Sequence, residues 1–311
     1  MKIRNIAIIS GLVVLLAGTV SAAPPKDAPN PLPGARAEIY KSIDGVKLPI
    51  HIFEPNGHKA GDARPAIVFF FGGGWNSGSP SQFEKQCTYL ASRGMVAMSA
   101  EYRVKSRHGV KAVSCFSDAK SAIRWVRQNA QRLGVDPNRI AAGGGSAGGH
   151  LAGALGTISA FDDPTEDPSI SALPNALVLF NPALVLAPVE GYDSGNPKKL
   201  AGMEARMGVP SHQLSPYHHI GSGIPPTIIF HGTADKTVPF SSAELFTRQA
   251  KKKGNPVELV PYEGQGHGFF NYKEKGNPAF LDTLKKTDAF LVSHGYLQGS
   301  NTAEAFFAQK E

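Results

Sequence analysis

The sequence predicts an α/β fold in which helices cover both faces of a mostly parallel sheet. Its 311 residues, 41% of them hydrophobic and 18% charged, have the composition of a globular protein and a length that suits one such domain. Short apolar runs alternate with longer segments of helical spacing, which is the pattern of strand–helix–strand units. The central apolar runs are continuous, as expected for strands that are buried on both faces.

The expected strands begin with a hairpin, because Asp44-Gly45 is a two-residue turn between two β-type segments. In chain order the strands are 39–41, 48–53, 66–71, 95–100, 140–142, 176–180, 227–231 and 257–261. The expected helices are 83–93, 115–133, 147–155, 243–253 and 279–294. Gly94, Gly134 and Gly254 end three of these helices. Residues 251–253 are lysines, which we interpret as cations at the negative end of a helix dipole rather than as a functional basic patch.

The first residues have the pattern of a targeting segment. Lys2 and Arg4 precede an apolar run over 6–20, and small residues follow up to Ala22. This order predicts a secretory signal peptide over 1–22, cleaved after Ala22, and hence a secreted or periplasmic protein. An uncleaved anchor helix is the alternative, and the apolar run is short for a full membrane span.

The rest of the chain divides into three parts. Residues 23–36 are a Pro-rich leader, 37–297 are the α/β domain, and 298–311 are a polar tail that we expect to be frayed. The formal net charge is +7, and its cations form no stripe along the chain. We therefore expect no nucleic-acid partner, and no membrane association once the signal peptide is removed.

Two cysteines, Cys87 and Cys115, are present. In an oxidising compartment an even pair is compatible with a disulfide. Two buried free thiols are the alternative. Both stay open, because the sequence alone does not bring the two sulfur atoms together.

Ser146 lies in the motif Gly-Gly-Ser-Ala-Gly over 144–148. A serine between flanking glycines, after a strand and before a helix, is typical of a nucleophile elbow, where the hydroxyl stands exposed on a sharp turn. In a chain with 34 glycines the motif alone is weak. A flexible loop or a phosphate cradle is the alternative, but the Lys-Ser/Thr that a phosphate loop needs is missing.

Two further groups complete the chemistry that a nucleophilic serine needs. Asp235 and His267 follow the strands 227–231 and 257–261, so we expect both at the same sheet edge as Ser146. Taken alone, Asp235 is compatible with an ordinary turn aspartate and His267 with an ordinary loop histidine. Together, in the order Ser, Asp, His, they predict a base and the acid that orients it.

A tetrahedral oxyanion also needs preorganised hydrogen-bond donors. Gly72–Gly74 follow the strand 66–71 and offer bare backbone N–H groups, and Ala147 offers another directly after the serine. A plain turn is the alternative for the three glycines. Their place, one strand–helix–strand–helix unit before the elbow, favours an oxyanion hole.

The motifs at 71–75, 144–148, 231–235 and 266–268 together resemble the α/β-hydrolase esterases. The resemblance covers about residues 40–295 and is nearest to hormone-sensitive-lipase-like enzymes and secreted bacterial acetyl and feruloyl esterases. It implies an α/β-hydrolase fold, a serine carboxylesterase that uses no cofactor, and Gly73, Gly74 and Ala147 as oxyanion donors. It also implies a structural segment that contains Asp118, Ala122 and Trp125.

Two positions depart from this family. Phe71 stands where the family has a histidine that braces the oxyanion loop, so the loop must be held in another way. Gly145 stands where relatives often carry an acidic residue, which predicts different access near the nucleophile. Neither change removes a catalytic group.

The expected cap is small or absent, because only the segment 182–215 is available to form a lid. With Trp75 beside the oxyanion loop as a candidate substrate contact, this favours an open cleft for a small ester or acylated sugar. Feruloyl esters, formamides and peptides are alternative substrates, and a catalytically dead binding protein is the alternative outside enzymes. His212, His218 and His219 lack nearby carboxylates or cysteines, so we expect no metal.

Overall fold

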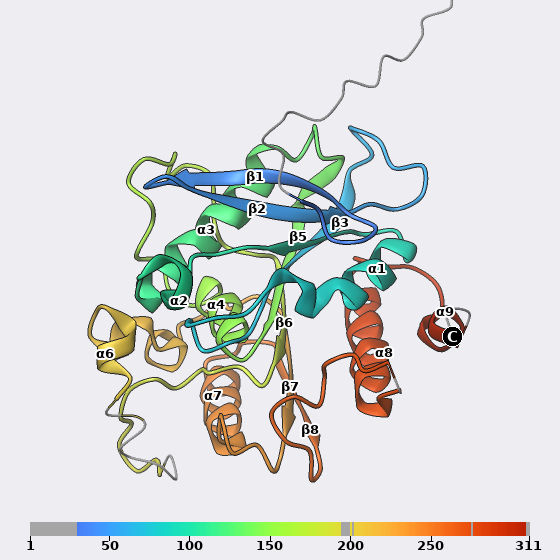
Figure 1. The fold of residues 1–311 in the computed structure, drawn as a ribbon. Helices are drawn as coiled ribbons and strands as arrows, with labels where there is room; N and C mark the ends of the chain where they lie inside the picture. Colours follow the sequence, from blue (N-terminus) through green and yellow to red (C-terminus); the bar gives the residue numbers. More distant parts are fainter. Residues whose placement is uncertain (1–29, 194–199, 201, 275, 309–311) are drawn as a thin grey trace, which may run out of the picture.

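The computed structural model describes residues 30–193, 200, 202–274 and 276–308, and an eight-stranded sheet forms their centre (Figure 1). The strands are β1 Arg36–Ile43, β2 Val46–Phe53, β3 Arg64–Phe70, β4 Val96–Ala100, β5 Val135–Gly145, β6 Ala176–Phe180, β7 Thr227–Gly232 and β8 Val257–Tyr262. Their spatial order is β1-β2-β4-β3-β5-β6-β7-β8. β2 pairs antiparallel with both neighbours, whereas the pairs from β4 to β8 are parallel. The predicted fold class is confirmed.

Helices cover both faces of this sheet (Figure 1). One face carries α3 Ala112–Gln128, α4 Ala147–Leu155 and α7 Phe240–Lys252, and the other carries α1 Glu84–Ser92 and α8 Pro278–Ser293. Shorter helices are α2 Lys105–His108, α6 Glu204–Met207, and the 3-10 turns η1 Pro80–Phe83, η2 Ser211–Leu214 and η3 Pro216–His219. Within the described ranges no helix has both the length and the apolar content that a membrane span requires.

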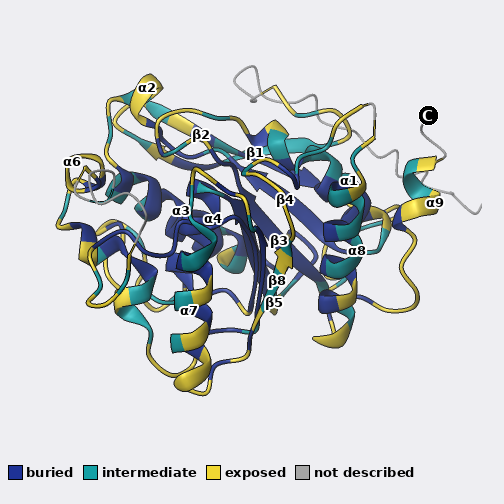
Figure 2. Ribbon diagram, turned by 90° about the horizontal axis from the view of Figure 1, so that it is seen from below, coloured by how far each residue is buried: buried dark blue, intermediate teal, exposed yellow. Residues whose placement is uncertain are grey.

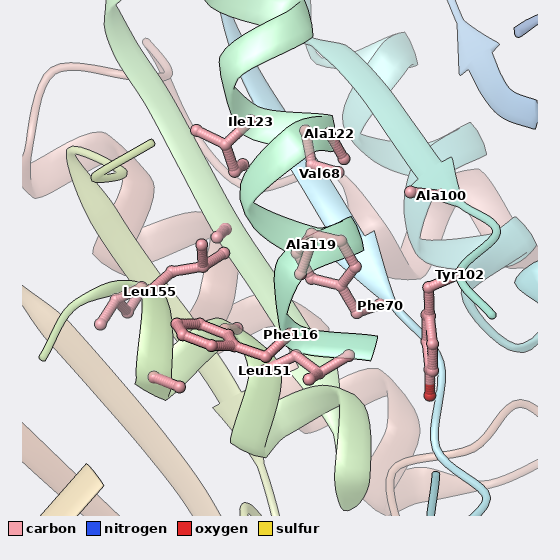
Figure 3. Close-up of a cluster of buried hydrophobic side chains, with 14 of the residues drawn as sticks. Val68, Phe70, Ala100, Tyr102, Phe116, Ala119, Ala122, Ile123, Leu151 and Leu155 are labelled. Carbon is pink, nitrogen blue, oxygen red and sulfur yellow. The ribbon is translucent and has the colours of Figure 1, made fainter. Parts of the chain in front are cut away.

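The side chains of the central strands alternate between the two faces of the sheet and fill two cores. Figure 2 shows the central strands of the sheet coloured as buried. On β3, Val68 and Phe70 point into the core under α3 and α4, while Ile67 and Phe69 point into the core under α1 and α8. Figure 3 shows the first of these cores, where Ala119 and other residues of α3 face β3. Because β3 is buried on both faces of the sheet, its sequence is a continuous apolar run.

The helix expected over 115–133 begins and ends earlier in the sequence than predicted. α3 begins three residues earlier, at Ala112, and ends at Gln128. Ala130 and Leu133 still lie buried in the same core, although the backbone there has left the helix. The apolar spacing therefore runs beyond the helix end, because burial and helical hydrogen bonding do not stop at the same residue.

A buried ion network joins α3 to the strands near the start of the chain. The fully buried carboxylate of Asp118 accepts two hydrogen bonds from Arg103, from Nε and Nη2, each 2.9 Å long. Lys41 lies 3.1 Å from the same carboxylate and 2.8 Å from Asp163. Asp118 is thus compensated on both oxygens, as a buried charge must be. Its position confirms the structural role that the family resemblance implied.

The two cysteines are free, so the disulfide alternative is wrong. Cys87 lies in α1 and is buried in the core under α1 and α8, whereas Cys115 lies in α3 and is buried in the other core. The sheet separates them. Burial raises the pKa of the Cys115 thiol to about 12, so it stays protonated and unreactive at neutral pH.

The end of the chain is also more ordered than its polar composition predicts. A short helix, α9 Ala303–Ala308, follows α8, and Ala303 is buried. Phe307 packs edge-on against Phe280 of α8. The expectation of a frayed tail is therefore wrong for 303–308, because two adjacent aromatic side chains dock this segment. The predicted signal peptide over 1–22, its cleavage point and the leader up to residue 29 lie outside the described residues.

Candidate active site

Ser146 connects the end of β5 to the start of α4. Its backbone has φ 54° and ψ −115°, a conformation that costs a residue with a side chain roughly 1–3 kcal/mol. A hydrogen bond of 2.9 Å from its N–H to the carbonyl of Phe180 in β6 holds this turn. The structure therefore has the strained elbow that the motif predicts.

The glycines around the serine are required by close packing. A Cβ on Gly148 would lie well under 3.0 Å from the carbonyl oxygens of Phe70 and Phe71. A Cβ on Gly144 would lie 2.5 Å from the carbonyl carbon of Gly148. The helix α4 therefore approaches β3 and β5 more closely than any side chain allows.

We expect Gly148→Ala to lower the free energy of unfolding by about 3 kcal/mol or more, because the obstructing atoms belong to backbone and have no rotamer to adopt. Denaturant unfolding of the two proteins measures this difference. Gly221→Ala is the matched control, since a Cβ there meets nothing within 4 Å. Equal losses in the two variants would contradict the packing argument.

The structure brings Ser146, His267 and Asp235 together. Ser146 Oγ lies 2.8 Å from His267 Nε2, and His267 Nδ1 lies 2.6 Å from Asp235 Oδ2. The aspartate follows β7 and the histidine follows β8, so all three lie at the carboxyl edge of the parallel strands. The three side chains have the geometry of a catalytic triad.

Asp235 is surrounded by hydrogen-bond donors. Burial of the carboxyl opposes ionisation, but hydrogen bonds from His231, from His267 and from the backbone outweigh it and hold its pKa well below the usual range. The backbone donors are the N–H groups of Thr237, at 2.7 Å, and Val238, at 2.9 Å. The carboxylate is therefore charged throughout the pH range in which a histidine titrates.

Two residues that the sequence analysis did not single out position the loops of Asp235 and His267. His231 is fully buried, with Nε2 at 2.9 Å from the carbonyl of Val238 and 3.4 Å from Asp235 Oδ2, so this nitrogen carries the hydrogen. Asn181, at φ 41°, donates to the carbonyl of His267 and accepts from the N–H of Gly232 at 3.1 Å. Asn181 follows β6 directly, and asparagine tolerates positive φ, which was the one signal available.

The three glycines after β3 have different tasks. Gly72 donates its N–H to Gln82 Oε1 at 2.6 Å, and Asn271 in turn accepts from Gln82 at 2.9 Å. Gly73 and Gly74 have φ 122° and 64°, and within the described chain no group accepts a hydrogen bond from either N–H. Both glycines line the same pocket as Ser146 and Ala147. The two glycines expected as oxyanion donors are thus the two with free N–H groups.

The oxyanion loop is braced without the family histidine. The ring of Phe71 stacks on Tyr102, with centroids 4.1 Å apart, and the hydroxyl of Tyr102 donates to the carbonyl of Phe71 at 2.7 Å. Together with the bond from the Gly72 N–H to Gln82, this holds the peptide group between Phe71 and Gly72 at both its oxygen and its N–H. The hydrogen bond therefore comes from another side chain, and position 71 contributes packing instead.

Gly145, where relatives often have an acidic residue, is covered by an aromatic ring. A Cβ there would lie well under 3.0 Å from Phe270, which lines the pocket beside the serine. Phe270 stacks on Phe180, with ring centroids 4.9 Å apart. An apolar wall thus replaces the carboxylate, which explains why this position must be glycine here.

A cavity of about 330 Å³ opens over the serine. Its wall is formed by Gly72, Gly73, Gly74, Trp75, Gln82, Ser146, Ala147, Ala183, Met203, Arg206, Thr237, Val238, His267, Gly268, Phe270 and Asn271. The described part of the segment 182–215 contributes Ala183, Met203 and Arg206, and these residues form a small lid over one side of the cavity. The predicted small cap is present.

Trp75, the candidate substrate contact, lines the cavity, but most of its ring is covered by other side chains. It is 5% exposed, its Nε1 donates to His150 Nδ1 at 3.1 Å, and the guanidinium of Arg206 lies 5.2 Å from its ring centroid. His150 in turn donates from Nε2 to the carbonyl of Leu214 at 2.7 Å, and burial lowers its pKa to about 4, so it is neutral. Trp75 is therefore a fixed wall of the cavity that ties the oxyanion loop to α4 and the lid.

The histidines in and just after the segment 182–215 bond to the protein itself. His218 lies 2.8 Å from Ser215 Oγ and 3.2 Å from the carbonyl of Pro188, and His219 lies 3.1 Å from the carbonyl of His212. Among the described residues, no group of three or more His, Cys, Asp or Glu side chains is placed to hold a metal ion. The rings of His218 and His219 thus make hydrogen bonds within the protein.

Comparison with protein families gives two matches. The BD-FAE family matches residues 50–249, which is more than half of the chain, and the dienelactone hydrolase family matches residues 208–293. The second match covers the segment that carries Asp235 and His267. Both families therefore overlap the candidate site.

The chain is also similar to curated esterases. It is 29% identical to Esterase LipC of Mycobacterium tuberculosis over 66% of this chain and 53% of that protein. It is 31% identical to Carboxylesterase NlhH of the same organism over 43% of this chain and 42% of that protein. The chain thus spans about half the length of the curated relatives that it matches.

Among solved structures, the thermophilic esterase Est2 of Thermogutta terrifontis matches with a TM-score of 0.81 and 54% identity, over 85% of this chain and 94% of that one. Structures of that esterase phosphonylated by sarin and bound to propionate or butyrate match similarly. Fold, site geometry and these matches agree. The chain therefore belongs to the BD-FAE family, within the α/β-hydrolase serine esterases.

Proposed function

We propose that this protein is a serine carboxylesterase that cleaves short-chain acyl esters through an acyl-enzyme intermediate. The observation that carries the proposal is the contact chain from Ser146 Oγ through His267 to Asp235, at 2.8 and 2.6 Å, beside two glycines with free N–H groups. The esterase relatives support the same reaction class.

In the first step, Ser146 Oγ attacks the carbonyl carbon of the ester while His267 Nε2 takes the hydroxyl proton. Asp235 holds His267 with Nδ1–H toward its carboxylate, so Nε2 is the nitrogen that is free to accept. Negative charge develops on the former carbonyl oxygen. The N–H groups of Gly73, Gly74 and Ala147 stabilise it without rearrangement.

The tetrahedral intermediate then collapses. The C–O bond to the alcohol breaks, and His267 gives its proton to the departing alkoxide, which leaves the acyl group on Ser146. Water attacks this acyl-enzyme with His267 again as the base, and the carboxylic acid and free serine are released. Each proton that His267 accepts is thus returned within the same half-reaction.

A short acyl group fits the site best. Phe270 and Met203 supply apolar walls, and the cavity of about 330 Å³ also has to accommodate part of the alcohol. The Thermogutta esterase that matches this chain was solved with propionate and with butyrate. With the signal sequence expected at 1–22, this favours work outside the cytoplasm, with an acetyl group on a plant or algal polysaccharide as one substrate.

We expect kcat/KM for p-nitrophenyl esters to be highest from acetyl to butyryl and to fall by about tenfold or more at octanoyl, because a longer chain outgrows the cavity. Initial rates across the series measure this preference. A rate that rises steadily to octanoyl would overturn the short-chain proposal, and faster turnover of methyl ferulate than of acetyl esters would favour a feruloyl esterase.

A further inference from the structure

A second recess of about 220 Å³ adjoins the catalytic cavity, and we refer to it as the basic recess. It is lined by Gly74, Trp75, Asn76, Lys105, Val110, Lys111, Ala205 and Arg206. Gly74, Trp75 and Arg206 line the catalytic cavity as well, so the two spaces share a wall. A substrate that extends beyond the serine in this direction meets the basic recess.

The charges of the basic recess are all of one sign. Lys105 of α2, Lys111 before α3 and Arg206 of α6 bring three cations to it, and none of its lining residues is acidic. Figure 1 shows α2 and α6 on the same side of the molecule. The described residues that line the catalytic cavity include Arg206 but no lysine, aspartate or glutamate. Potentials from like charges add in a cleft and attract an ion of opposite sign.

Nearby carboxylates do not neutralise this charge. Glu204, in the same helix as Arg206, is engaged by the N–H of Ser211 at 3.1 Å. Glu101 is paired with Arg107 of α2. Neither acid pairs with a cation of the recess. In the described part of the chain, no salt bridge involves Lys105, Lys111 or Arg206.

Arg206 is held in place before any ligand arrives. Its Nη2 donates to the carbonyl of Gly74 at 2.6 Å, and its guanidinium carbon lies 5.2 Å from the ring centroid of Trp75, which His150 fixes from behind. Among the described residues, one of its five N–H groups is used in this way. A planar, preorganised guanidinium with free donors matches the two oxygens of a carboxylate.

We infer that the basic recess binds a carboxylate on the alcohol part of the substrate, so that the preferred substrates are short-chain esters of acidic alcohols, such as an O-acetylated uronic acid. The inference rests on the proposed function, because a short acyl group leaves the alcohol as the only part of the substrate that reaches beyond the cavity. Lys105 and Arg206 are then specificity-determining residues for the known reaction class.

A pair of isosteric substrates tests this inference. 4-Acetoxybenzoate and 4-acetoxybenzamide differ in charge and hardly in size. For the wild type at low salt we expect kcat/KM to be about 30-fold higher for the carboxylate, because each of the three cations contributes about threefold at roughly 6 Å. The ratio should fall toward one at 1 M NaCl, where screening shortens the range of these charges to about 3 Å.

Lys105→Gln should lower the carboxylate-to-amide ratio by about threefold, because it removes one cation of the recess whose side chain has no hydrogen bond or ion pair among the described residues. Arg206→Gln should lower the ratio further. It should also slow both substrates somewhat, since its contact with the Gly74 carbonyl is lost. Lys252→Gln, at the exposed end of α7, removes the same charge far from the recess and should leave the ratio unchanged.

Each outcome separates the inference from the proposed function. Equal kcat/KM for the two esters, or a ratio that Lys105→Gln does not change, overturns the carboxylate site while carboxylesterase activity stands. Failure to hydrolyse either ester or p-nitrophenyl acetate overturns the proposed function itself. An equal loss of ratio in Lys252→Gln would show a general effect of net charge and would also overturn the site.

Discussion

Ser146→Ala is expected to lower kcat for p-nitrophenyl acetate by about 10⁶-fold, to near the uncatalysed rate plus the remaining oxyanion stabilisation. Alanine has no oxygen to form the acyl-enzyme, while its smaller side chain leaves the elbow glycines and their packing in place. Initial rates at saturating substrate measure the loss. Far-UV circular dichroism and the unfolding midpoint show whether the variant keeps its fold.

A fluorophosphonate probe gives a second readout that does not depend on a chosen ester. The wild type should be labelled at Ser146 and Ser146→Ala should not, whereas Ser42→Ala, at an exposed serine of β1, should label like the wild type. An unlabelled wild type would favour a catalytically dead binding protein. Retained activity in a folded Ser146→Ala variant would refute the assignment of the nucleophile.

Asp235→Asn should lower kcat by about 10⁴-fold and leave KM for a small ester nearly unchanged. An amide in place of the carboxylate offers a donor to His267 Nδ1 as readily as an acceptor, so the histidine is no longer held with Nε2 free for the serine. Asp44→Asn, in the exposed turn between β1 and β2, removes one carboxylate without touching the site and should keep full activity. Comparable losses in both variants would contradict the orienting role.

Asp235 also has a pH-dependent effect on stability with a defined sign. Its pKa is lower in the folded protein than the ordinary value of about 3.9, so ionisation stabilises the fold above that pH, and the contribution is lost as the pH falls below it. We expect Asp235→Asn to destabilise the protein at pH 7 and to differ less from the wild type near pH 3. Denaturant unfolding at the two pH values checks this, and a difference that grows on acidification would contradict it.

The sequence alone predicts the three catalytic residues and their order along the chain. Ser146, Asp235 and His267 each follow a strand, and parallel strands place their carboxyl ends at one edge, so the meeting of the three side chains follows from local patterns and one topological rule. The oxyanion glycines were found in the same way. For the parallel strands, most of the predicted ends lie within a few residues of the observed ends, because the apolar runs are bounded by turn residues.

What the sequence left open, or predicted wrongly, has a cause of another kind. Cys87 and Cys115 are kept apart by the sheet, and Trp75 is covered by Arg206 and His150. The helix α9 depends on aromatic contacts with residues far away in sequence. Each of these outcomes depends on which side chains meet after folding, and no local spacing encodes that.

Gly145 and Phe71 show most clearly what the sequence determines and what the tertiary structure determines. From residue types alone it follows that the chain builds a strand–elbow–helix unit, which residue supplies the nucleophile, and which family features are missing. Only the folded molecule shows that Phe270 occupies the space beside Gly145, and that Tyr102 and Gln82 brace the loop at Phe71. Backbone turns are decided by neighbours along the chain, whereas the wall and the charge of a pocket are decided by packing between segments up to 189 residues apart, as for Gln82 and Asn271.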